Sequence, residues 1–207
     1  MPRDATDTRE RLLREAGRLF ATRGVYQVNM REIVQAAGQR NVSAITYHFG
    51  SRDGLLYEIL RRHGDPLDVE RGGIMDRIGE RIDTRRLVGA LLLPLAAELA
   101  TPDGRDYLRV VAQLSEKFAA WNTEAALNPP HLRRILALIE GRPAGLQPGI
   151  RRQRTLQMIM LMTAAMAERA RLVAEAAPME LGEDEFLGNL ADMIVGALEA
   201  PSGTLLR

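Results

Sequence analysis

The sequence contains no cysteine among its 207 residues. Disulfide bonds, cysteine-ligated zinc sites and thiol catalysis are therefore excluded. A long apolar run is also missing, because the stretch from Leu87 to Leu99 contains Pro94 and Glu98, and a membrane-spanning helix needs roughly 20 apolar residues. The first residues, MPRDATDTRERLL, lack the apolar core of a signal peptide. We therefore expect a cytoplasmic protein with no membrane partner.

Sequence motifs of catalysis and metal binding are missing too. The three histidines, His48, His63 and His131, lie far apart in the sequence, and none belongs to a His-Glu-x-x-His zinc site. The single lysine, Lys117, follows no glycine-rich phosphate-binding loop, and no Gly-x-Ser-x-Gly nucleophile elbow occurs. We therefore expect no enzyme activity, no metal ion and no cofactor.

Charge is distributed unevenly along the chain. Residues 1–64 contain 11 arginines and seven acidic residues, a net charge of +4, whereas residues 65–207 have a net charge of −3. A basic excess is expected where a protein meets a polyanion such as DNA. We therefore expect a DNA-binding domain over residues 1–50, linked by a helix over 51–64 to a larger domain over 65–207.

The pattern of apolar residues is helical nearly throughout, and we find no strand-like alternation, so we expect an all-α fold. Apolar residues recur at helical spacing over residues 6–23, and Gly24 ends that segment. Asn29 and Glu32 have the spacing of a capping box, and Ser51 suits the N-cap of another helix. After Gly64, further helices are expected near 74–82, 84–100, 104–126, 131–140, 150–177 and 183–199, separated by breaks such as Gly72-Gly73.

Residues 29–56 are typical of a helix-turn-helix, two short helices joined by a turn, here containing Gly38. In this motif the first helix braces the second, which lies in the major groove of DNA. Apolar residues that suit the bracing are Ile33, Val34, Ala37, Val42, Ile45 and Phe49. The side chains that we expect to contact DNA are Arg31, Arg40, Asn41, Ser43, Thr46, Tyr47, His48 and Arg52.

Each of these DNA contacts has a structural alternative. Tyr47 can pack with only its hydroxyl in water, His48 can hydrogen-bond within the domain, and Arg52 can be an ordinary surface charge. If Arg52 does meet DNA, it shares a phosphate with the free N–H groups of the helix that begins beside it.

The segment resembles the TetR family of bacterial transcriptional regulators. The resemblance rests on Ala37-Gly38 and on the run YHFGSRDGLL from Tyr47 to Leu56, and it covers roughly residues 9–60. It implies an all-helical, ligand-binding C-terminal domain that dimerises through its last two helices.

The segment also departs from the family pattern. One extra residue lies between Gly38 and Tyr47, Thr46 stands where members usually have tyrosine, and Met30 stands where they often have threonine. The extra residue leaves open which of Ser43, Thr46 and Tyr47 faces a base rather than a phosphate.

The helices near 150–177 and 183–199 are apolar on more than one face, so each must bury more than one face. One face can pack on its own domain and the other on a second copy of the chain, which predicts a homodimer. A fully intramolecular core is the alternative. The residues expected at the dimer interface are Ile159, Met166, Leu190, Met193 and Ala197.

Aromatic residues and methionines of the larger domain suit an apolar ligand pocket. They equally suit a plain hydrophobic core, and the sequence does not identify a ligand. The expected pocket residues are Leu91, Leu95, Tyr107, Phe118, Trp121, Met158 and Met162.

Together these expectations describe a ligand-responsive, dimeric regulator. We expect a repressor that binds a palindromic double-stranded DNA operator and releases it on binding a small-molecule effector, with the helix near 51–64 as transmitter. Two alternatives stay open: a helical interaction module that does not bind DNA, and a transcriptional activator without small-molecule control.

Overall fold

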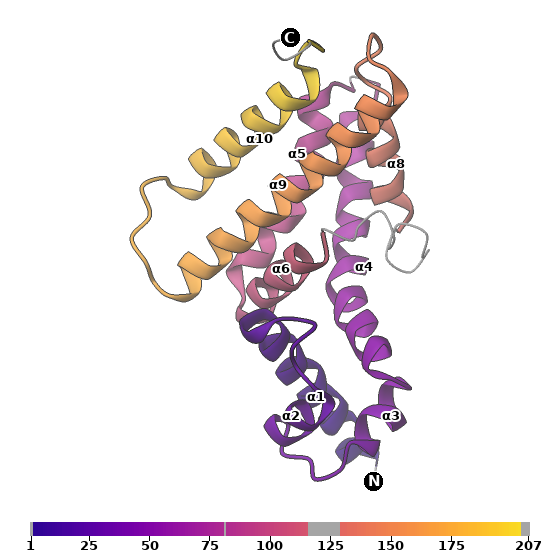
Figure 1. The fold of residues 1–207 in the computed structure, drawn as a ribbon, viewed down its shortest axis with the longest axis vertical. Coiled ribbons are helices and arrows are strands. Elements are labelled where there is room, and N and C mark those ends of the chain that lie inside the picture. The colour runs from indigo at the N-terminus through magenta and orange to yellow at the C-terminus, as the bar shows by residue number, and fades with distance from the viewer. Residues whose placement is uncertain (1, 81, 116–128, 204–207) are drawn as a thin grey trace.

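The computed structural model describes residues 2–80, 82–115 and 129–203, and within these ranges every regular element is helical (Figure 1). The expectation of an all-α fold is therefore confirmed. The elements are α1 (Pro2–Arg23), α2 (Met30–Ala36), α3 (Ser43–Phe49), α4 (Arg52–Ile78), α5 (Thr84–Ala97), the 3₁₀ turn η1 (Glu98–Ala100), α6 (Pro102–Ser115), α8 (Pro130–Glu140), α9 (Pro148–Ala174) and α10 (Glu183–Glu199).

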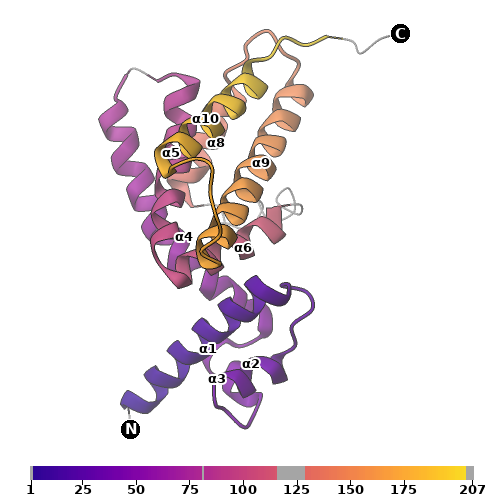
Figure 2. The same ribbon diagram turned by 90° about the vertical axis from the view of Figure 1, so that its left-hand side faces the viewer.

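The N-terminal lobe consists of α1, α2, α3 and the first turns of α4, and it lies below the helical bundle in Figure 2. Its core is formed by fully buried apolar side chains from each of these helices, among them Phe20, Ile33, Ile45 and Leu55. The apolar stripes expected from the sequence therefore meet in one place.

The helix α4 is longer than the sequence predicts. It runs from Arg52 to Ile78 without ending at Gly64 or at Gly72-Gly73, so the predicted helix over 51–64 with breaks at these glycines is wrong. Gly72 faces α8, and a Cβ atom there would lie 2.8 Å from the imidazole ring of His131. Gly72 thus lies at a close contact between α4 and α8 and not in a turn.

The larger lobe is a bundle around the second half of α4. The helices α5 and α8 pack on α4, and α6 packs along α9. The antiparallel helices α9 and α10 lie side by side along one edge of the bundle (Figure 1). Within the described ranges, no helix has the length and apolarity needed to cross a membrane.

Candidate DNA-binding surface and buried cavity

The two short helices of the N-terminal lobe are held by local caps. Asn29 and Glu32 form the expected capping box: the Asn29 carboxamide oxygen accepts from the Glu32 backbone N–H at 3.2 Å, and a Glu32 carboxylate oxygen accepts from the Asn29 N–H at 2.9 Å. Gly38 follows α2 with a φ of +70°, which favours glycine. The bond from the Asn29 backbone and the hydrogen bond from Arg23 both lower the pKa of Glu32.

The turn before α3 uses one of the predicted DNA-contact residues as a cap. The side-chain oxygen of Asn41 accepts from the backbone N–H of Ser43 at 2.9 Å. This bond satisfies one of the free N–H groups at the start of α3. Only the NH₂ group of the Asn41 carboxamide thus remains outside this cap.

One face of α3 is buried and the other is open to solvent. Ile45 is fully buried, whereas Ser43, Thr46 and Tyr47 are exposed, with Tyr47 at 81% of its full exposure. His48 is half-buried and meets the Tyr47 ring edge-on, with 4.9 Å between ring centroids. An aromatic side chain so exposed contributes little to the core, so packing does not explain Tyr47.

The arginines of the N-terminal lobe differ in their partners. Arg23 forms an ion pair with Glu32, and Arg9 forms one with Glu58. Arg31 and Arg40 are exposed, and neither has an acidic partner within the described ranges. Unpaired cations beside the exposed face of a helix are groups that the phosphates of DNA attract.

Arg52 points into the N-terminal lobe. Its guanidinium donates to the backbone carbonyl oxygens of Val25 and Val28 and lies over the ring of Phe20. In this structure the side chain fixes the α1–α2 loop to the start of α4. These bonds use the Nε and Nη2 atoms of Arg52. The predicted phosphate contact is therefore left to the other N–H groups of the guanidinium.

A second side chain ties the same loop to the larger lobe. Gln113 of α6 donates to the carbonyl oxygen of Phe20 at 3.0 Å and accepts from the backbone N–H of Val25 at 2.7 Å. Val25 is thus bonded from both sides, by Gln113 through its N–H and by Arg52 through its carbonyl group.

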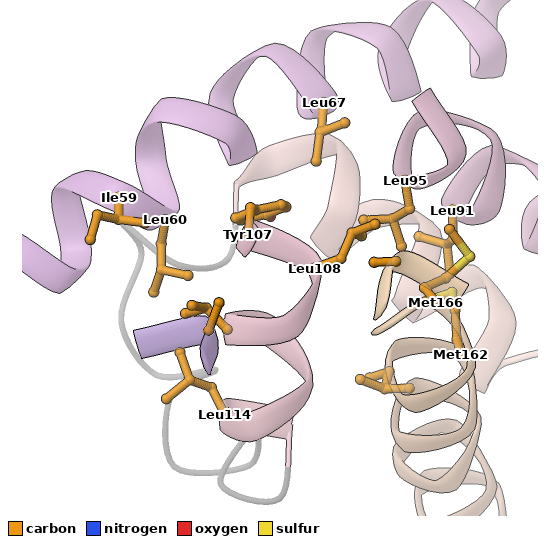
Figure 3. Packing of buried hydrophobic residues seen from close by; sticks show 14 of the residues in the cluster. Ile59, Leu60, Leu67, Leu91, Leu95, Tyr107, Leu108, Leu114, Met162 and Met166 are labelled. Carbon is orange, nitrogen blue, oxygen red and sulfur yellow. The ribbon is translucent and has the colours of Figure 1, made fainter. Parts of the chain in front are cut away.

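The larger lobe contains a cavity of about 140 Å³ between α4, α5, α6, α8 and α9. Of the predicted pocket residues, Leu95, Tyr107 and Met162 line it (Figure 3). Leu91 and Met158 are buried in the core but are not part of its lining. The predicted residues Phe118 and Trp121 lie outside the described ranges.

Apart from Tyr107, the sequence does not predict the polar residues of the cavity. Arg71 of α4 is buried there, and burial lowers the pKa of its guanidinium. Burial also raises the pKa of Tyr107 to about 12. The Tyr107 ring stacks on His63 of α4 at 4.7 Å, and His63 in turn meets Glu98 at 2.7 Å. These contacts join α4, α6 and η1 beside the cavity.

Three of the five predicted interface residues are core residues of the single chain. Ile159, Met166 and Leu190 are buried, and Ile159 lines the cavity. Of the five, only Met193 and Ala197 are exposed, and both lie on α10. The apolar repeat of α9 and α10 therefore reflects mainly intramolecular packing, which corrects the assignment of these three residues.

Comparison with known proteins agrees with this architecture. Residues 12–59 match the family model of the bacterial regulatory proteins of the tetR family. None of the curated proteins matches the chain. No group of three or more metal-ligating side chains is found in the part of the chain that the structure describes.

Solved structures cover nearly the whole chain. A transcriptional regulator from Rhodococcus sp. Rha1 has 21% identity and a TM-score of 0.52, with 92% of this chain and 95% of that one aligned. A Rhodococcus sp. protein described as a TetR-family transcriptional regulator has 20% identity and a TM-score of 0.47, over 93% and 99% of the two chains. A protein from Streptomyces coelicolor A3(2), described as a transcriptional regulator, has 24% identity and a TM-score of 0.44, over 90% and 98%. At these identities the likeness concerns the fold.

Proposed function

We propose that the chain is a dimeric repressor of the TetR family of bacterial transcriptional regulators, whose family model its residues 12–59 match, and that it releases its operator when a small molecule binds the cavity of the larger lobe. The observation that carries the proposal is the outward face of α3, where Ser43, Thr46 and Tyr47 are exposed above a buried Ile45.

In this proposal α3 lies in the major groove of the operator. Thr46 and Tyr47 face the DNA from the middle of α3, and Ser43 from its first turn. Arg31 and Arg40, which lack acidic partners within the described ranges, meet phosphates on either side. His48, packed edge-on against Tyr47, orients that ring.

The proposed dimer forms along α9 and α10. Their exposed residues include Met160, Ala164, Met193 and Ala197, which are small or flexible enough for two helix pairs to approach closely. A two-fold axis there presents two copies of α3 to half-sites about 34–36 Å apart or further, which suits a palindromic operator.

The proposed response to ligand runs through α4 and α6. Both helices line the cavity, and each also holds the α1–α2 loop, α4 by Arg52 and α6 by Gln113. A ligand that binds better to one arrangement of α4 and α6 shifts the population of N-terminal lobe orientations. Its effect on operator affinity equals its differential affinity for the two states.

The test is fluorescence anisotropy of the purified protein on DNA from its own promoter, at several salt concentrations. We expect tight binding to a palindromic segment and weak binding to a scrambled one. Tyr47→Ala and Arg40→Ala weaken operator binding by roughly 1–3 kcal/mol each, and Arg40→Ala also reduces the salt slope by about 1. The matched control is Arg133→Ala, an exposed arginine on α8, which leaves both quantities unchanged.

Two results would count against this function. Equal, weak binding to every DNA sequence would favour a helical interaction module. Operator binding that turns promoter transcription on, and that no small molecule weakens, would favour an activator without ligand control. Sedimentation of Met193→Arg tests the dimer separately, because a charge in the proposed interface shifts the protein towards monomer while each N-terminal lobe stays folded.

A further inference from the structure

Arg71 is a buried cation in the wall of the cavity. The residue retains 5% of its exposure, and its Nε atom has no hydrogen-bond partner. It comes from α4, one turn beyond Asp68, and its Nη1 atom lies 3.9 Å from the nearer carboxylate oxygen of that residue. This separation is beyond hydrogen-bond distance.

The carboxylate of Asp68 already has other partners. Its two oxygens accept from the backbone N–H groups of His131 and Leu132, at 3.1 and 2.7 Å, and so hold the start of α8 against α4. Asp68 therefore balances part of the charge of Arg71 but does not complete its hydrogen bonds. Burying a guanidinium with incomplete hydrogen bonds is unfavourable in free energy, and an anion that bound to it would offset much of this penalty.

Other charges of the cavity do not supply that anion. Arg61 and Asp65 also belong to its lining, and they form an ion pair with each other at 3.4 Å, at an exposed part of α4. Tyr107 stays neutral at ordinary pH, because burial raises its pKa to about 12. Its hydroxyl can thus act as a hydrogen-bond donor but not as an anion.

The rest of the lining is apolar apart from Ser115 and Thr163, whose hydroxyls donate to backbone carbonyl oxygens of their own helices. Figure 3 shows Leu60 of α4, Leu114 of α6 and Met162 of α9 among the side chains that surround this region. A cavity of about 150 Å³ in another protein holds benzene. At about 140 Å³, this cavity suits a molecule whose apolar body is close to the size of one aromatic ring.

We propose that the cavity binds a small organic acid, a monocarboxylate with an apolar body of about one ring, whose carboxylate pairs with the guanidinium of Arg71. A carboxylate matches the planar fork of arginine, with two parallel hydrogen bonds. Only the statement that this acid acts as the effector rests on the proposed function, because binding to the cavity does not require DNA.

The experiment is calorimetric titration of the wild-type protein with benzoate, phenylacetate and hexanoate, each against its uncharged amide. We expect at least one acid to bind with a dissociation constant below about 1 mM, and to bind about 10- to 100-fold more tightly than its amide, the range typical of a hydrogen bond to a charged group. Inorganic phosphate, which has charge but no apolar body, does not compete.

Arg71→Met removes the preference for acid over amide, and Arg71→Lys, which keeps the charge but not the fork, reduces it. The matched control is Arg77→Met, an exposed arginine on the same helix, which leaves the preference unchanged. Because the comparison of acid with amide uses the wild-type protein, it stands even where Arg71→Met does not fold.

Several outcomes overturn the proposal: no acid binds at about 1 mM, amide and acid bind equally, or phosphate competes as well as the acids do. A preference for acid that survives in folded Arg71→Met also overturns it. Operator binding is measured on the same samples. Specific operator binding without acid binding rejects the ligand class alone, and acid binding that leaves operator affinity unchanged rejects the ligand response in the proposed function alone.

Discussion

Arg31 and Arg40 lie on the open surface of the N-terminal lobe, whereas Arg71 is enclosed in the larger one. The exposed pair is open to solvent and suits a polyanion that arrives from there, where attraction is long-ranged and weakened by salt. The buried arginine suits one small anion of fitting shape, where attraction is short-ranged and little screened. Burial thus separates two uses of one residue type that the sequence alone does not distinguish.

The largest effect is expected from a substitution that disrupts the N-terminal lobe and leaves the larger lobe intact. A Cβ atom on Gly54 would lie 2.0 Å from the carbonyl oxygen of Phe49, a backbone atom that cannot move aside cheaply. We expect Gly54→Ala to lower the free energy of unfolding by about 2–4 kcal/mol and to abolish operator binding. Urea unfolding and anisotropy measure the two effects.

Gly17→Ala is the control for this substitution. Gly17 lies within α1, and an added Cβ would meet nothing within 4 Å. Alanine is the better helix former, so this variant gains about 0.5–1 kcal/mol and keeps operator binding. Equal destabilisation by both substitutions would show that the turn between α3 and α4 is not constrained as described.

A smaller effect is expected where the two lobes meet. Gln113→Met leaves the N–H of Val25 and the carbonyl oxygen of Phe20 without their side-chain partner. We expect a loss of about 1–3 kcal/mol and faster hydrogen exchange at the Val25 amide. Gln157→Met, an exposed position on α9, is the control. Unchanged exchange at Val25 would mean that Gln113 does not hold the α1–α2 loop in solution.

The local features of the N-terminal lobe could be read from the sequence because each depends on neighbours. Asn29 with Glu32 predicts a capping box, and Ser51 predicts a cap, which accepts from the Gly54 N–H at 2.9 Å. Arg52 could not be assigned in this way, since its partners Val25 and Val28 lie 27 and 24 residues away. Which DNA contacts each side chain makes stays a prediction.

The structure of the larger lobe depends on packing between distant segments, and there the helix breaks predicted from the sequence are wrong. Local propensity predicts breaks at Gly64 and Gly72, yet α4 continues through both, and Gly72 lies against the His131 ring of α8. A break at Gly72-Gly73 would place Arg71 next to a turn. Arg71 follows Gly64, Leu67 and Asp68 by seven, four and three residues, and this helical spacing puts it on the inward side of one long helix.

A third substitution separates residues that contact DNA directly from residues that hold the DNA-binding lobe in shape. Arg52→Ala removes bonds to two backbone carbonyls, so we expect a loss of about 1–2 kcal/mol in unfolding free energy together with weaker operator binding. Tyr47→Ala at an exposed position changes stability by less than about 0.5 kcal/mol while weakening operator binding. Weaker operator binding in Arg52→Ala without any loss of stability would return Arg52 to a direct phosphate contact.

The effect that is smallest at neutral pH concerns the burial of Tyr107 in the wall of the cavity. Burial raises the pKa of Tyr107 to about 12, whereas an unfolded tyrosine ionises near about 10. The contribution of this group to stability is therefore fully present below about pH 10 and is lost as the pH rises through about 12. Ultraviolet titration of the folded protein should show one of its four tyrosines ionising late, and Tyr107→Phe should remove that step alone. If all four ionise together while circular dichroism still reports the native fold, water reaches Tyr107 freely, and the low-dielectric surroundings inferred for Arg71 would not exist.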